Sequence, residues 1–288
     1  MNKIELPNYF TRNHRVPEVY VHSFSSDAYS DKSKVQLNAN LISFLTEGSK
    51  ELYYENDSQI VTNKDFVIAK SGNCLMSENL SEDKKYTSLL FFFSNNFVTH
   101  FKEKYQIENR VKQNNSEMES KFKIISYDTF ISNFVYSLQQ LIQSEITLTE
   151  DFLILKLEEI LLYLVQKNGE ETITFLDHHT LQKHHVRLKN IVEKNIFSKL
   201  TLEELAFLSH MSLSTFKREF YKIYTTSPSK WIQEKRLEKS AQMLLNDRER
   251  PIDVYASIGY ESLSSFTQSF KHKYGITPKQ YQLKKMNQ

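Results

Sequence analysis

Residues 200–220 read LTLEELAFLSHMSLSTFKREF, and their pattern returns in residues 258–281, IGYESLSSFTQSFKHKYGITPKQY. At an offset of 50 positions, aromatic residues and prolines match in these stretches and their continuations: Phe216 with Phe266, Phe220 with Phe270, Tyr224 with Tyr274, Pro228 with Pro278, and Trp231 with Tyr281. Five matches at one offset, each between chemically similar residues, indicate a duplicated supersecondary unit.

Each copy predicts a helix, a tight turn and a second helix. Thr201 and Glu204 have the spacing of a capping box, which places a helix start there. Ser212 can cap the second helix of this copy, expected over about 213–224. In the other copy, Gly259 begins the turn and Ser262 can cap the helix that follows.

On these second helices, the matched aromatic residues share one side, taking about 100° per residue. The opposite sides carry hydroxyl, amide and cationic groups and no carboxylate, which is the composition a helix needs to enter a major groove and meet phosphates. The residues that we expect to contact DNA are Ser214, Thr215, Lys217, Arg218 and Lys222 in the first copy, and Ser264, Ser265, Gln268, Lys271 and Lys273 in the second.

A linker helix joins the copies. Ser227 and Pro228 supply an N-cap and a proline at the first helical position, and an apolar pattern continues to Asn246. Such a helix is long enough to hold two helix-turn-helix units about one DNA turn (~34 Å) apart on one side of the duplex.

Residues 185–284 resemble the DNA-binding domain of the AraC/XylS family of transcription regulators. The resemblance rests on the two quoted stretches and on SPSKWIQEKRL at 227–237. It implies that the two units read adjacent major grooves. The positions that it assigns to base contact are Ser214, Lys217 and Arg218 in the first unit, and Ser264, Ser265 and Gln268 in the second.

We expect the two units to read bases unequally. Arg218 can contact guanine bidentately, at about 1–3 kcal/mol of discrimination. The family often has arginine where Gln268 stands, and an uncharged amide brings no charge to the groove. The second unit is therefore expected to act mainly as a clamp that holds phosphates through Lys271 and Lys273.

Charge is divided unequally along the chain. Residues 185–288 contain 18 Lys and Arg against 10 Asp and Glu, a net charge of +8, whereas residues 1–184 contain 19 against 25, a net of −6. This predicts that a polyanion binds the C-terminal part. A single cysteine, Cys74, excludes a disulfide-stapled extracellular fold, and no apolar stretch is long enough to span a bilayer. We expect a cytoplasmic protein without membrane contact.

The N-terminal part predicts a small antiparallel barrel or sandwich. Residues 1–34 are polar and favour loop, and from Val35 the hydrophobic period becomes two. Short strands are expected over 35–41, 52–54, 59–62, 66–69 and 86–93, within a β-barrel over about 35–94, with helices over about 96–168. In AraC-like regulators a cupin-like effector domain often stands here, which the strand spacing resembles. The expected class is α+β with an all-α C-terminal domain.

Aromatic residues on these strands are candidates for an effector cavity, with plain core as the alternative. They are Phe44, Tyr53, Phe66, Phe91 and Phe93. A rival function, a metal-dependent cupin enzyme fused to a DNA-binding domain, needs clustered His and Glu ligands, and no histidine lies between Val35 and Ser94. Phosphate-binding glycine loops and nucleophile elbows are also missing. We predict no enzyme activity, metal or cofactor.

The helix expected over 150–167 has a wider apolar surface than one sheet-facing side needs. The family resemblance implies a homodimer through the helices of this domain, and burial within the subunit is the alternative. We assign 1–170 to effector sensing and dimerisation, 171–184 to a linker, and 185–288 to DNA binding. Four histidines at 178, 179, 184 and 185 suggest a metal, but without a cysteine or carboxylate cluster we favour a solvated linker.

Together these patterns predict a sequence-specific DNA-binding transcription regulator controlled by a small-molecule effector in its N-terminal domain. The alternative is a DNA-binding protein whose N-terminal domain only oligomerises. The expected partners are duplex DNA, a second copy of the chain and the effector, and the function also allows RNA polymerase.

Overall fold

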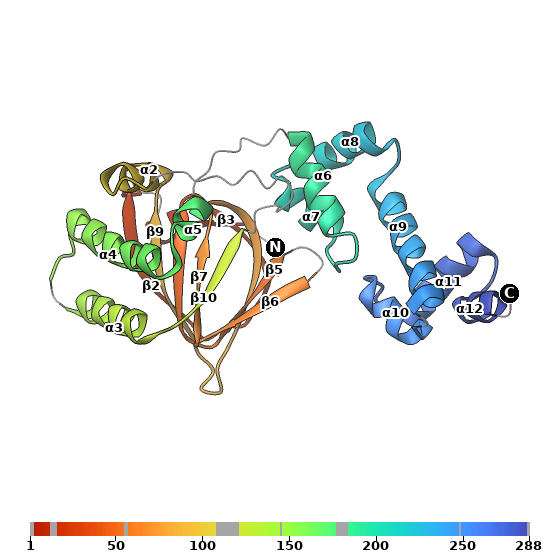
Figure 1. The fold of residues 1–288 in the computed structure, drawn as a ribbon, viewed down its shortest axis with the longest axis horizontal. Helices are drawn as coiled ribbons and strands as arrows, with labels where there is room; N and C mark the ends of the chain where they lie inside the picture. Colours follow the sequence, from red (N-terminus) through yellow and green to blue (C-terminus); the bar gives the residue numbers. More distant parts are fainter. Residues whose placement is uncertain are drawn as a thin grey trace. The chain divides into compact units, whose positions relative to one another are not determined.

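The computed structural model describes residues 3–11, 16–54, 57–107, 121–144, 146–176, 184–247 and 249–286. The chain forms two compact units, an α+β unit from β1 to α5 and an all-α unit from α6 to α12 (Figure 1). The predicted fold class is confirmed. Residues 177–183, with two of the four histidines noted above, lie outside the described residues.

The first unit is built on two five-stranded sheets. Their strands are β1 (Ile4–Leu6), β2 (Val19–Ser26), β3 (Ser30–Leu37), β4 (Asn40–Glu47), β5 (Ser49–Tyr54), β6 (Asp57–Thr62), β7 (Asp65–Ala69), β8 (Gly72–Asn79), β9 (Tyr86–Phe93) and β10 (Phe122–Ser126). The strand orders are β1-β3-β8-β5-β6 and β10-β7-β4-β9-β2. β1 runs parallel to β3, and the second sheet is antiparallel throughout. A shared apolar core lies between the two sheets.

The second sheet is buried on both faces. Along β9, Leu90 and Phe92 belong to the core between the sheets, whereas Leu89, Phe91 and Phe93 belong to a second core under the helices. Side chains alternate between faces along a strand, so a strand covered on both sides becomes continuously apolar. This explains why residues 89–93 form an unbroken run of leucine and phenylalanine.

The expected cavity aromatics lie in other places. Phe44, Phe66, Phe91 and Phe93 all face the helices and are completely buried in that second core. Tyr53 is half-buried on the first sheet, and its hydroxyl lies 2.9 Å from the Ser77 Oγ and 3.0 Å from a Glu51 carboxylate oxygen. The four phenylalanines thus belong to an apolar core, and none of them lines the cavity that lies between the two sheets. Periodicity placed them on one face of the sheet, but it did not tell whether that face meets the helices or the other sheet.

The barrel also extends beyond the expected 35–94. Within residues 1–34, β2 pairs with β9 from Val19↔Phe93 to Ser26↔Tyr86, and β3 begins at Ser30. On the other side of the sheet, β10 pairs with β7. β2 and β10 are edge strands with partly exposed polar residues. Such strands carry a weak hydrophobic period, which is why residues 1–34 were expected to be loop.

The helices of this unit are α1 (Asn8–Thr11), α2 (Asn95–Lys104), α3 (Thr129–Gln143), α4 (Glu150–Asn168) and α5 (Glu171–Leu176). The core on the outer face of the second sheet takes residues from α2 to α5. The predicted linker start is corrected here, because residues 171–176 form α5 and bury Ile173 and Leu176 in that core. On α4, Leu157 and Leu161 are fully buried within the subunit, so they cannot form an interface.

The second unit consists of α6 (His184–Lys194), α7 (Leu202–Leu208), α8 (Leu213–Tyr224), α9 (Pro228–Gln242), the π-helical turn η1 (Met243–Asp247), α10 (Pro251–Ser257), α11 (Leu263–Tyr274) and α12 (Pro278–Met286). The Thr201–Glu204 capping box and the caps by Ser212 and Ser262 are confirmed. Ser227 stands at the N-cap of α9 but makes no side-chain capping bond. Each copy has its own core, with Phe216 and Phe220 in one and their counterparts in the other.

Arg236 of α9 joins the two copies. Its guanidinium donates from Nε to the Ile196 carbonyl at 2.6 Å, from one terminal nitrogen to the Gly259 carbonyl at 2.8 Å, and from the other to the Ser198 carbonyl. Gly259 has φ +79°, and a Cβ there would lie 2.6 Å from the Phe197 carbonyl oxygen and 2.9 Å from the Arg236 Cζ. Glycine is therefore required for this close approach.

We predict that Gly259→Ala lowers the free energy of unfolding of the second unit more than Gly275→Ala does. Both glycines have left-handed φ, which alone costs about 1–2 kcal/mol for alanine. A Cβ at Gly275 meets no atom within 4 Å, whereas one at Gly259 displaces the junction. Urea unfolding, followed by the fluorescence of Trp231, the single tryptophan, measures the free energy of unfolding of each variant. Equal losses would contradict the steric argument.

Candidate nucleic-acid interface

The second helix of the first copy, α8, presents a polar face to solvent. Phe216 and Phe220 are fully buried on its inner side. The predicted DNA-contacting residues Ser214, Lys217, Arg218 and Lys222 are all exposed, and Thr215 is half-buried. The structure thus brings the first set of candidates together on one helix, with the side chains of Arg218 and Lys222 67% and 57% exposed.

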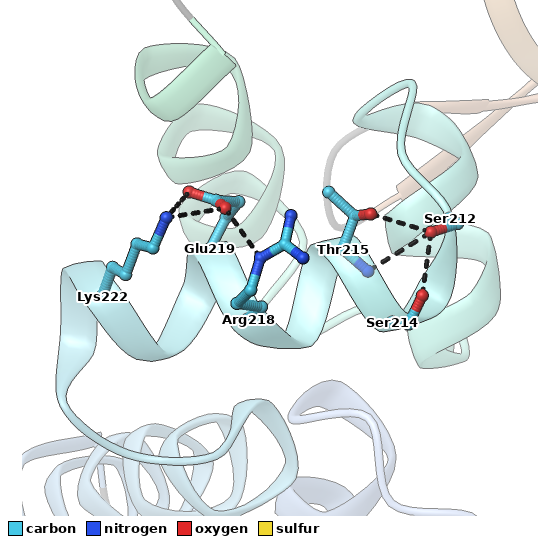
Figure 2. A network of polar contacts seen from close by, with 6 residues as sticks. All are labelled: Ser212, Ser214, Thr215, Arg218, Glu219 and Lys222. Atoms are coloured by element: carbon cyan, nitrogen blue, oxygen red, sulfur yellow. Dashed lines mark hydrogen bonds and ion pairs between the residues drawn. The ribbon is translucent and has the colours of Figure 1, made fainter.

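Hydroxyl groups order the start of α8. The Ser212 Oγ accepts the Thr215 backbone N–H at 3.2 Å, donates to the Thr215 Oγ1 at 2.9 Å, and lies 3.0 Å from the Ser214 Oγ (Figure 2). A helix N-terminus attracts anions because its first backbone N–H groups have no partner within the helix. This end of α8 is therefore suited to a phosphate or a base edge.

Glu219 is a member of this surface that the sequence analysis missed. Its Oε1 accepts from the Arg218 Nε at 3.2 Å and from the Lys222 Nζ at 2.9 Å, and its Oε2 accepts from the same lysine at 3.1 Å (Figure 2). Its largely buried carboxylate lies beside the exposed face of α8, where only hydroxyl, amide and cationic groups were expected. The i,i+3 spacing of Glu219 and Lys222 was a signal that could have revealed it.

The matching helix of the second copy, α11, presents a less charged face. Ser264, Ser265, Gln268 and Lys271 are exposed, opposite the buried Phe266 and Phe270. Lys273 lies elsewhere, because its Nζ is 3.2 Å from the Glu234 carbonyl oxygen and 3.3 Å from the Glu238 carboxylate of α9. In this structure the Lys273 ammonium group faces the linker helix, and its expected role in holding phosphate stays a prediction.

The first unit contains a cavity of about 150 Å³ between its sheets. Its lining is mainly apolar, with residues from β1, α1 and both sheets, and includes two charged side chains, Lys50 and Glu78. The Lys50 Nζ donates to the Ser43 Oγ at 3.1 Å. Burial by itself lowers the pKa of Lys50, but the neighbouring Tyr86 and Glu78 hold it above its ordinary value, and burial raises the pKa of Glu78.

The barrel does contain a histidine, because β2 belongs to it. The His22 ring stacks on Phe10 with 3.9 Å between ring centroids, and its Nδ1 lies 3.4 Å from the Tyr20 hydroxyl. Burial lowers the pKa of His22. In the part of the chain that the structure describes, no three His, Cys, Asp or Glu residues are placed to hold a metal ion. None of the described helices has the length and apolarity of a membrane span.

Two family models match the chain, one in each unit. Residues 40–176 match the ExsA N-terminal regulatory domain, and residues 205–284 match a helix-turn-helix domain. The first match ends at Leu176, the last residue of α5, which agrees with the packing of that helix on the first unit.

Individual proteins are similar over part of their length. The virulence regulon transcriptional activator VirF of Yersinia enterocolitica is 33% identical over 132 residues, which are 46% of this chain and 49% of that protein. The regulator ExsA of Pseudomonas aeruginosa is 35% identical over 43% of this chain and 45% of its own. These matches thus span about half the length of each relative. The apo structure of a ToxT variant from Vibrio cholerae superposes with a TM-score of 0.44 at 15% identity, covering 92% of this chain and 97% of that one. A family model thus matches in each unit, and the two matches agree with the resemblance to the AraC/XylS family of transcription regulators.

Proposed function

We propose that the chain is a sequence-specific DNA-binding transcription regulator that reads two adjacent major grooves. The observation that carries the proposal is the pair of exposed polar faces on α8 and α11, the matching helices of two copies that Arg236 of the linker helix connects. The net charge of +8 over residues 185–288 supports binding to a polyanion. The proposal assigns no enzymatic activity to the chain.

The test is to pass sheared genomic DNA of the source organism over the immobilised full-length chain and sequence what is retained. A regulator of this type retains a few promoter fragments, and its binding weakens steeply between about 50 and 200 mM salt. Retention that is uniform over the genome, or binding that does not respond to salt, would contradict the proposal.

Base readout is proposed to come mainly from the first unit. Arg218 offers two terminal nitrogens for a guanine, whereas Gln268, at the same position of α11, offers an amide without charge. Because Lys273 is bound to α9, the phosphate-holding role of the second unit rests on Lys271. The second unit therefore contributes less charge to DNA than the sequence alone indicated.

We predict that Arg218→Ala abolishes discrimination at one or two base pairs, whereas Gln268→Ala weakens specific binding by less than about tenfold, or 1.4 kcal/mol. The reason is the loss of a bidentate contact in one case and of an uncharged contact in the other. Binding curves against single-base variants of a retained fragment, at fixed salt, measure both. A larger loss of specificity in Gln268→Ala would reverse the assignment.

Lys271 and Lys273 form a matched pair, two residues apart on α11. We predict that Lys271→Ala weakens binding to all duplexes alike and flattens the salt slope by about one unit. Lys273→Ala should leave that slope unchanged, since the side chain is engaged with α9. The measurement is the dissociation constant of both variants over a series of salt concentrations.

An effector is proposed to bind in the barrel cavity of the first unit. Apolar walls with two polar groups, Lys50 and Glu78, are typical of small-molecule sites. The alternative is that this unit only assembles subunits. A thermal-shift screen of metabolites against the full chain separates the two, because a ligand that binds the native state raises its melting temperature. A ligand whose shift disappears in Met76→Trp, which fills the cavity, supports the effector.

A homodimer is proposed through the exposed apolar side chains of α3 and α4. Tyr136, Phe152 and Leu155 remain 64%, 39% and 60% exposed, although neighbouring positions on the same helices are fully buried.

RNA polymerase is a further proposed partner. The name of the similar protein VirF describes a transcriptional activator, and an activator of transcription acts on RNA polymerase.

We predict that Leu155→Glu converts the dimer to monomer without lowering the melting temperature of the monomer. Leu157→Ala, two residues away, should instead destabilise the first unit by about 2–5 kcal/mol, because Leu157 is fully buried. Sedimentation at micromolar concentration and thermal unfolding give the two readouts. A wild-type chain that sediments as a monomer would rule out the interface.

A further inference from the structure

Glu219 lies at the centre of the charges on α8. Its side chain is 13% exposed, yet it faces two exposed cations and makes hydrogen bonds to both. It is thus positioned more rigidly than the cations that it holds, since a largely buried side chain has few rotamers available. Figure 2 shows Arg218 and Lys222 reaching the Glu219 carboxylate from two different sides.

The contact uses one particular donor of Arg218. The bond to Glu219 comes from Nε, and neither terminal nitrogen has a hydrogen bond or ion pair to a residue that the structure describes. The guanidinium group is planar, so fixing Nε also restricts the plane in which the two terminal nitrogens lie. These two nitrogens are the pair that an arginine can present to the O6 and N7 of guanine.

The Glu219 carboxylate helps to orient Arg218, but it should lower the affinity of the chain for DNA of any sequence. It partly neutralises Lys222 and brings a negative charge close to the DNA-facing surface. A carboxylate in that place repels phosphates and lowers the number of counterions that binding releases. Its cost to non-specific affinity and its benefit to Arg218 can therefore be measured separately.

We propose that Glu219 is a positioning residue for base readout. It orients Arg218 toward one base pair and keeps Lys222 away from phosphates. Glu219 thereby raises discrimination between base pairs and lowers the affinity for DNA of any sequence. This inference rests on the proposed DNA-binding function. Nothing equivalent stands in the second copy, where the position 50 residues later is Ser269. The Ser269 Oγ instead accepts a hydrogen bond from Gln233 of α9 at 3.1 Å.

The test compares Glu219→Gln with Glu238→Gln in the full-length chain. Glu238 is a matched control, because it also pairs with two cations, Lys235 at 2.9 Å and Lys273 at 3.3 Å, but lies on α9. The probes are a duplex selected by the wild-type chain from a randomised pool, its single-base variants and an unrelated duplex. Each is titrated at several salt concentrations.

For Glu219→Gln we expect about a tenfold loss of discrimination at the base pair that Arg218→Ala identifies. Binding to the unrelated duplex should become several-fold tighter, with a salt slope steeper by up to about one unit as Lys222 gains a phosphate. Glu238→Gln should keep the wild-type discrimination. In an Arg218→Ala background, Glu219→Gln should cause no further loss of discrimination, because the two residues act as one unit.

Unchanged discrimination in folded Glu219→Gln, or an equal change in Glu238→Gln, would overturn the inference. Trp231 fluorescence reports whether each variant is folded; if Glu219→Gln is not, Glu219→Asp is measured instead, with a partial loss expected. The proposed function fails separately, when the wild-type chain selects no duplex. If Arg218→Ala loses discrimination and folded Glu219 variants keep it, the positioning role alone is wrong.

Discussion

One guanidinium group connects the two copies of the second unit. Arg236 satisfies carbonyl oxygens from the segment after α6 and from the turn before α11, and a buried carbonyl without a donor costs about 1–3 kcal/mol. Lysine cannot replace it, because one ammonium lacks the planar fork that reaches three acceptors. Position 259 requires glycine, because the Arg236 guanidinium and the Phe197 carbonyl leave no room for a Cβ. Arg236 therefore adds to the packing of α9 in both cores, which together fix the spacing between the two exposed helices.

In the first unit, the corresponding constraint is the sheet that is buried on both faces. Its outer face carries the helices, and its inner face closes the cavity. Lys50 of β5 crosses the space between the sheets, and its Nζ donates to the Ser43 Oγ of β4, so this one side chain contacts both sheets. Because closely packed interiors transmit strain, a shift of β4 or β9 would displace the side chains that pack between this sheet and the helices. The sheet is therefore a direct physical connection between the cavity and α3 and α4.

Local signals in the sequence were enough to predict the second unit. The capping box at Thr201 and the caps by Ser212 and Ser262 depend on residues within one helical turn, and the duplication supplied the arrangement. The tertiary contacts could not be predicted from the sequence. The face of each strand that meets the helices, and the side of α11 on which Lys273 finds a partner, are decided by elements far along the chain. Edge strands such as β2 were missed because they are half polar.

The two copies share a backbone pattern but use equivalent positions differently. Glu219 bonds to neighbours on its own helix, whereas Ser269 bonds to Gln233 of the linker helix, and Lys273 adds a second bond to the same helix. In the first copy, these polar bonds therefore order Arg218 and Lys222 on the exposed face of α8. In the second, they order the helix relative to its scaffold and leave Gln268 unassisted. Contacts to phosphates and to the scaffold fix the position of a helix, whereas contacts to bases specify sequence. A helix such as α11, which is bonded to α9 and carries an uncharged Gln268, is therefore better suited to fixing position than to discriminating between bases.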